Sequence, residues 1–193
     1  MLQNKLQITN DVELSKEEER ITKLKALELF DTKKINEFEV GTFTGLSKIH
    51  EFLFTDIYDF AGKIRKDNIA KSNFRFAAAF YLEEILSKID DMPQKNFDDI
   101  VKKYVEMNIA HPFMEGNGRS TRIWLDLILK KNLKVCVDWC KINKKDYLEA
   151  MEKSSTSSEK ICLLIQGALT DKVNDRELFL KGIDYSYYYE EVD

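Results

Sequence analysis

The sequence predicts an all-α protein, a helical bundle that carries one small β-hairpin. Glycine and proline are scarce, with 7 and 2 copies in 193 residues, and this scarcity favours long helices over many short strands. Apolar residues recur at helical spacing through most of the chain. Residues 58–77 lack this stripe and combine turn-forming pairs with strand-like residues. We expect the hairpin there, although a plain surface loop fits the pattern equally well.

The first two helices are expected over residues 15–30 and 39–54. Ser15 is the expected N-cap of the first helix, because Glu18 follows three residues later as in a capping box. Each segment has an apolar stripe at helical spacing. The stripes consist of Ile21, Leu24 and Leu27 in the first helix, and of Leu46, Ile49 and Leu53 in the second.

Three more helices are expected over residues 77–89, 97–110 and 119–131. Pro93 separates the first of these from the second, because proline lacks the backbone N–H that a helix interior needs. The other two have apolar faces at helical spacing. Those faces consist of Phe97, Ile100, Val101, Tyr104, Val105, Asn108 and Ile109, and of Ile123, Trp124, Leu127 and Ile128.

The C-terminal third is expected to contain helices over residues 143–152, 158–169 and 174–190. Residues 135–139, VCVDW, indicate a short strand or a buried turn ahead of them. Along one side of the last helix lie Leu178, Phe179, Ile183 and Tyr187.

Composition excludes several classes of function. The net charge of −4 and the pI near 5.4 provide no general basic field for nucleic acid. Cys136, Cys140 and Cys162 form no CxxC pair, and with 2 histidines in the chain they predict reduced thiols rather than a zinc site. The chain has no signal peptide and no run of about 20 apolar residues, so we expect a cytoplasmic protein.

The stretch HPFMEGNG, which begins at His111, holds one of the histidines, one of the prolines and two of the glycines. Pro112 disfavours helical backbone at His111, so the preceding helix is expected to end there. Gly116 and Gly118 permit a tight turn before a helix that starts at Arg119. Free N–H groups in such a turn and at a helix start attract anions.

The side chains around this turn suit polyphosphate chemistry. Arg119 and Arg122 share a helix face, and their guanidinium groups match phosphate oxygens. Glu115 offers the oxygen ligand that Mg²⁺ prefers beside phosphates, and Asn117 can donate to a phosphate oxygen. His111 is the residue next to this turn that is best suited to act as a general base. Together they predict a polyphosphate cradle with a metal ligand and a base.

Each of these residues also has a plainer interpretation when it is taken alone. A histidine at a helix end is more often a cap, and Gly-x-Gly is most often a turn. Arg122 could pair with Asp126 one helical turn later. Their combination within twelve positions favours a functional site.

The segment HPFMEGNGRSTR resembles the signature of the Fic family, HPFx(D/E)GNGRxxR, at every defined position. The similarity extends over roughly residues 20–191. It implies the Fic fold and a single domain over residues 1–193. Within it the resemblance implies an N-terminal helical extension (1–35), a flap hairpin (62–76), a catalytic helix–loop–helix (97–131) and a C-terminal inhibitory helix (174–193).

The resemblance implies a Mg²⁺-dependent protein adenylyltransferase, which moves AMP from ATP to a Tyr, Ser or Thr hydroxyl and releases pyrophosphate. The implied roles are a base at His111, a Mg²⁺ ligand at Glu115, the α-phosphate site at Gly116, Asn117 and Gly118, and contacts of Arg119 and Arg122 with the β- and γ-phosphates.

The resemblance also implies partners. An extended target segment would pair with the flap as an added strand, through Lys63, Ile64, Ile69 and Lys71. By analogy the target is a type II topoisomerase subunit. Direct nucleic-acid and membrane contacts are not expected, and a homo-oligomer is a further implied state.

The C-terminal helix resembles the inhibitory motif (S/T)xxxE(G/N) through Ser186 and Glu190, with Glu191 departing at the last position. The resemblance implies a salt bridge between Glu190 and Arg122 that removes the γ-phosphate contact. Tyr187 is a candidate for self-modification.

Other activities stay open. The related Doc branch phosphorylates its target and has lysine after the asparagine, where this chain has Gly118, which favours AMP transfer. The loop leaves phosphocholine transfer open. Two further alternatives are removal of AMP from a target and nucleotide binding with little turnover. The presence of both His111 and Glu115 argues against a module that only binds nucleotide.

Overall fold

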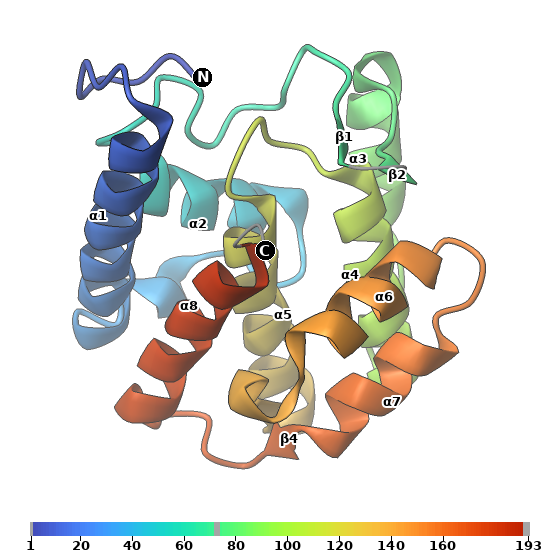
Figure 1. Ribbon diagram of the computed structural model, residues 1–193. Coiled ribbons are helices and arrows are strands. Elements are labelled where there is room, and N and C mark those ends of the chain that lie inside the picture. Colours follow the sequence, from blue (N-terminus) through green and yellow to red (C-terminus); the bar gives the residue numbers. More distant parts are fainter. Residues whose placement is uncertain (1, 72–73, 191–193) are drawn as a thin grey trace.

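A computed structural model describes residues 2–71 and 74–190, without the side chains of Lys71 and Glu190, and it confirms the predicted helical fold (Figure 1). Each segment that was expected to be helical contains an α-helix. The helices are α1 (Asp11–Asp31), α2 (Phe43–Phe54), α3 (Leu82–Asp90), α4 (Phe97–Ala110), α5 (Asn117–Leu133), α6 (Lys144–Lys153), α7 (Glu159–Gly167) and α8 (Arg176–Glu190). Short 3₁₀ turns η1 (Lys34–Glu37), η2 (Ala79–Tyr81) and η3 (Trp139–Lys141) join some of them.

Helix α1 differs from the prediction in its start and in its buried face. Asn10 is the N-cap, and its side chain accepts the Glu13 N–H at 2.9 Å, so the expectation of a cap at Ser15 was wrong. Leu24, expected in the core, is 54% exposed. The buried face instead consists of Leu14, Glu18, Thr22, Ala26 and Leu29.

Helix α5 lies in the middle of the bundle, with α2, α4 and α8 packed around it (Figure 1). It is buried on nearly every side, through apolar residues such as Trp124 and also through Arg119 and Arg122. The Trp124 indole N–H donates to the carbonyl of Thr42 at 2.9 Å, which ties α5 to the start of α2. The loop between α4 and α5, which holds the candidate site residues, therefore precedes the most enclosed helix of the described chain.

The predicted hairpin is present, although each of its strands has only two residues. Strand β1 (Ala70–Lys71) pairs antiparallel with β2 (Phe74–Arg75). A second small sheet was not predicted: β3 (Cys136–Val137), within the segment expected to be a strand or a buried turn, pairs antiparallel with β4 (Leu169–Thr170).

The second sheet is fixed to α5 by the partly buried carboxylate of Asp126. Asp126 accepts hydrogen bonds from the Val137 N–H at 2.8 Å and from the Trp139 indole at 3.0 Å. Burial raises the pKa of Asp126 to about 7. Across residues 2–71 and 74–190, no helix has the length and apolar character that a membrane span requires.

Candidate active site

The loop between α4 and α5 is shaped by two residues in left-handed backbone conformation. His111 ends α4, as Pro112 predicts, but its φ is 49°, whereas a residue before proline usually adopts extended backbone. Gly116 precedes α5 with φ of 73°. A Cβ at Gly116 would lie 2.3 Å from the ring of Phe54, so no larger residue fits there.

Helix α5 begins at Asn117 rather than at the expected Arg119, so Gly118 lies in its first turn and not before it. The Asn117 side chain closes the loop on Phe113: it accepts the Phe113 N–H at 2.9 Å and donates to the Phe113 carbonyl at 2.7 Å. The first N–H groups of a helix lack acceptors within it, so the loop opens onto an anion-attracting helix start. In this structure the side-chain amide of Asn117 is thus used to hold the loop.

His111 presents a half-buried imidazole beside the loop. Its Nδ1 lies 3.3 Å from the carbonyl of Asn108, an acceptor that favours the proton on Nδ1 and leaves the lone pair on Nε2. The ring of Phe76 stacks on the imidazole, with centroids 3.6 Å apart.

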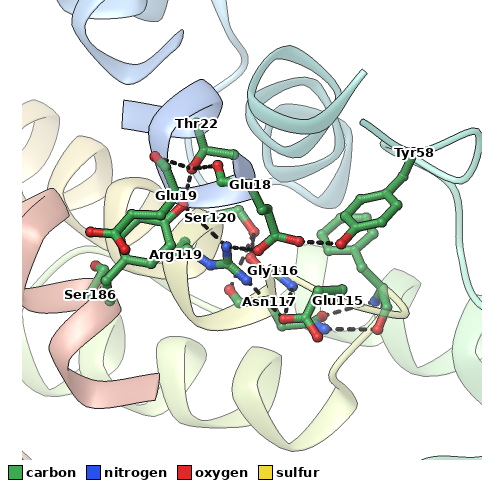
Figure 2. A network of polar contacts seen from close by, with 12 residues as sticks. Glu18, Glu19, Thr22, Tyr58, Glu115, Gly116, Asn117, Arg119, Ser120 and Ser186 are labelled. Carbon is green, nitrogen blue, oxygen red and sulfur yellow. Dashed lines mark hydrogen bonds and ion pairs between the residues drawn. The ribbon is translucent and has the colours of Figure 1, made fainter. Parts of the chain in front are cut away.

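A network of charges surrounds Arg119 (Figure 2). Its Nη1 donates to Glu18 of α1, and its Nη2 donates to Glu115 Oε1 at 2.8 Å. The hydroxyl of Tyr58 donates to the same Glu18 carboxylate. Arg119 and Glu18 are both buried, whereas 41% of the Glu115 side chain is exposed. Arg119 is therefore held between a buried and an accessible carboxylate.

Sequence reasoning missed Glu18 and Tyr58 as parts of this site. Glu18 was taken as a capping residue, yet its spacing of four from Leu14 and Thr22 places it on the buried face of α1. An acidic residue on a buried face needs a cationic partner. That spacing was the signal available in the sequence.

Arg122 is buried and contacts α8 through Ser186. Its Nε donates to Ser186 Oγ at 2.8 Å, and its Nη2 donates to the Ser186 carbonyl at 3.1 Å. The rings of Tyr147 and Tyr189 flank the guanidinium at 5.7 and 5.3 Å. The expected salt bridge to Glu190 involves a side chain outside the described part of the chain, and Glu191 lies outside it altogether.

Tyr187 is half-buried and directed into the site. Its hydroxyl contacts Thr22 Oγ1 and accepts a hydrogen bond from Arg119 Nη1 at 3.2 Å. A modifying group could reach this hydroxyl only after α8 had moved.

The expected flap residues lie along the segment before and within β1. Lys63 is exposed, Ile64 and Ile69 are partly buried, and Lys71 pairs with Phe74 through its backbone. The side chain of Lys71 is not described.

His50 contacts the loop between α4 and α5, and it was not predicted from the sequence as part of the site. Its Nδ1 accepts the Gly62 N–H at 2.9 Å, so Nε2 carries the proton and donates to the Glu115 carbonyl at 2.8 Å. The ring stacks on Phe113 with centroids 3.8 Å apart. Burial lowers the pKa of His50 to about 3, which keeps the ring neutral.

Glu115 fits a magnesium ion that is bound together with phosphates. Within the described ranges, no group of three or more His, Cys, Asp or Glu residues forms a metal cage. Mg²⁺ does not need one, because it commonly takes one or two carboxylates, water and substrate phosphates as ligands. The exposed carboxylate of Glu115, at the entrance of the loop, is a donor of that kind.

Comparison with known proteins gives consistent matches. Residues 42–129 match the Fic/DOC family. Protein adenylyltransferase VbhT of Bartonella schoenbuchensis is 29% identical over 95% of this chain and 40% of its own length. A probable protein adenylyltransferase Fic of Salmonella typhimurium is 29% identical over 42% of this chain and 46% of its own length. The chain thus spans less than half the length of these two curated relatives.

Solved structures share the fold. The BepC protein of Bartonella tribocorum, with bound AMPPNP, superposes with a TM-score of 0.73 at 18% identity, over 88% of this chain and 92% of that one. The FIC domain of Bep8 from Bartonella sp. 1-1C gives 0.74 at 17% identity, over 92% of both chains. At these identities the likeness establishes the helical fold with its small hairpin.

Proposed function

This chain carries a Fic domain, and from that premise we propose that it is a protein adenylyltransferase, which transfers AMP from ATP to a Tyr, Ser or Thr hydroxyl of a target protein. The observation that carries the proposal is the junction of α4 and α5. One helix ends in an imidazole, the next begins with the Gly116 turn, and two arginines follow within two helical turns. The names of the curated relatives agree with this assignment.

In the proposed reaction, His111 Nε2 accepts the proton of the target hydroxyl as its oxygen attacks the α-phosphorus of ATP. The bond between the α-phosphorus and the bridging oxygen breaks, and pyrophosphate leaves. The amides at the start of α5, from Gly116 to Gly118, stabilise charge on the α-phosphate oxygens. Arg119 and Arg122 hold the β- and γ-phosphates and offset their charge.

Glu115 would hold the Mg²⁺ ion, which supplies charge neutralisation between the α- and β-phosphates. In the structure Glu115 Oε1 accepts from both Arg119 Nη2 and its neighbour Gly116 N–H, each at 2.8 Å. With Glu115 holding a metal, Arg119 would keep its contact with Glu18, and its Nη2 would be available to phosphate. Glu18 would thus preserve the orientation of Arg119 through the exchange.

The chain is proposed to be autoinhibited by α8. Ser186 of α8 occupies Arg122, the residue assigned to the γ-phosphate, and Tyr187 covers Arg119. We extend this to a salt bridge between Glu190 and Arg122, on the strength of the motif resemblance. The proposed target docks on the flap, and type II topoisomerase subunits are the first candidates to assay.

The test is an assay of AMP transfer to lysate proteins from ATP that is labelled at the α-phosphate. The wild-type protein, Glu190→Gly and His111→Ala are compared in the presence of Mg²⁺. The proposal requires more labelled protein with Glu190→Gly than with the wild type, and none above background with His111→Ala. Equal labelling by Glu190→Gly and its His111→Ala double variant would refute the role of the base.

A further inference from the structure

Arg65 is a buried cation whose side chain binds backbone rather than acidic groups. It is 3% exposed, and burial lowers its pKa. Its hydrogen bonds run from Nε to the His111 carbonyl at 2.7 Å, from Nη1 to Asp67 O at 2.6 Å, and from Nη2 to Ala77 O at 2.5 Å and Ala110 O at 3.2 Å. The Arg65 N–H also donates to Pro112 O at 2.8 Å.

These contacts place one guanidinium at the C-terminal end of α4. The last carbonyls of a helix lack donors within it and carry partial negative charge, which a cation offsets. Arg65 satisfies the carbonyls of Ala110 and His111, and it does so where His111 has the uncommon φ of 49°. The planar fork of arginine can reach several oxygens at once, which a lysine ammonium cannot do in the same way.

The same guanidinium also joins the two sides of the flap hairpin. Asp67 precedes β1 and Ala77 follows β2, and both carbonyls accept from Arg65. The Ala77 N–H donates to the Ile109 carbonyl of α4 at 3.0 Å. The base of the hairpin is thereby bound to the end of the helix that presents His111.

Phe76 then extends this attachment to the imidazole itself. It lies next to Ala77, and its ring stacks on His111 with an interplanar angle of 17°. The ring of Phe74 packs edge-on against Phe76 at 5.2 Å. The hairpin therefore contacts both the backbone and the side chain of His111.

We propose that Arg65 and Phe76 are positioning residues for His111: Arg65 fixes its backbone and Phe76 fixes its ring, so that the hairpin and the imidazole move as one unit. The consequence for transfer rests on the proposed function. A target segment that pairs with the hairpin would then also be aligned with the imidazole. The reaction rate depends steeply on this alignment, since a misplacement of about 1 Å can lower the rate about 100-fold.

The first experiment reads the position of the imidazole by NMR and needs no activity. The chain has 2 histidines, so His111→Ala assigns both sets of ring signals. Phe76→Leu should remove the ring current above His111 and shift its ring protons downfield, while His50, stacked on Phe113, keeps its shift and reports an intact fold. Phe80→Leu is the matched control, because Phe80 is 89% exposed and should leave both histidines unchanged.

The second experiment separates positioning from nucleotide binding. Arg65→Gln and Arg65→Lys are compared with Arg20→Gln, a control at an exposed arginine. Both Arg65 variants should lower the AMP-transfer rate constant by about 10-fold or more, with ATP affinity and the His50 signal unchanged. Lysine should not restore the rate, because charge alone does not reproduce the fork.

An unmoved His111 signal in Phe76→Leu, or full activity of Arg65→Gln, would overturn the proposal. If the Arg65 variants lost ATP affinity together with the AMP-transfer rate, the proposal would also be overturned, since this would indicate a general effect on the loop. If the wild-type protein transfers no AMP, the proposed function fails, while the NMR comparison of Phe76→Leu with Phe80→Leu still decides the positioning.

Discussion

At Gly116 the loop has no room for a side chain and adopts a backbone that other residues resist. The ring of Phe54 fills the space into which a Cβ would project, and φ is 73°. The sequence shows that glycine and proline are concentrated here, and from this we predicted a tight turn between two helices. The contact with Phe54 could not be predicted, because Phe54 belongs to another helix and sequence spacing does not reveal which helices meet.

Replacement of Gly116 by alanine is expected to destabilise the protein by about 2–4 kcal/mol, through overpacking against Phe54 and left-handed strain. Urea denaturation measures this free energy of unfolding. Gly167→Ala is the matched control, because a Cβ there meets nothing within 4 Å, and its effect should stay below about 1 kcal/mol. Equal stability of the two variants would contradict the packing described for the loop.

At the scale of elements, His50 connects α2, the turn at Gly62 and the loop before α5 through two hydrogen bonds. The unfolded chain binds a proton at His50 near pH 6.5, whereas the folded chain, with a pKa of about 3, does not. The stability that this group contributes is therefore complete above pH 6.5 and is lost progressively as the pH falls toward 3.

A variant His50→Gln keeps a donor and an acceptor but cannot be protonated. Between pH 7.5 and 5, the stability of the wild type relative to His50→Gln should fall by about 2 kcal/mol. Denaturation curves at the two pH values give this difference. A difference that stays constant would show that His50 titrates normally and is not enclosed as described.

The elements themselves were predictable to very different degrees. Helix α4 was predicted with its observed bounds, because Pro112 marks its end and a regular apolar face runs along its length. In α1 the face of Ile21, Leu24 and Leu27 was predicted to be buried because it is apolar, but the fold buries the face that carries Glu18 and Thr22 among apolar residues. The second sheet escaped prediction because its two-residue strands are joined through long-range contacts.

At the scale of the whole molecule, α8 packs on both α1 and α5 and meets both arginines of the site. The sequence motif implied a contact of Glu190 with Arg122 and assigned Ser186 no partner, whereas in the structure Ser186 Oγ accepts from Arg122 Nε at 2.8 Å. The sequence could not predict that Tyr187 and Glu18 would enclose Arg119, since that arrangement needs three helices from distant parts of the chain. Figure 2 shows the Glu18 side of this arrangement.

If α8 restrains the enzyme, Ser186→Ala should raise the AMP-transfer rate by about 10-fold. The variant loses a hydrogen bond to a charged group, worth about 1.5–3 kcal/mol, and α8 releases Arg122 more often. Initial rates at saturating target measure the change. Tyr188→Phe is the control, because Tyr188 is 43% exposed and the ring is kept; a rise of the same size in that variant would argue against a specific role of Ser186.

The most direct measurement of the central claim compares ATP labelled at the α-phosphate with ATP labelled at the γ-phosphate, in parallel reactions of Glu190→Gly with Mg²⁺ and target protein. Attack at the α-phosphorus places the α-label on protein and leaves the γ-label in pyrophosphate, and we expect this result. Label from the γ-phosphate on protein would identify a kinase, and label from neither position would indicate a nucleotide-binding module. Either of these results would contradict the account.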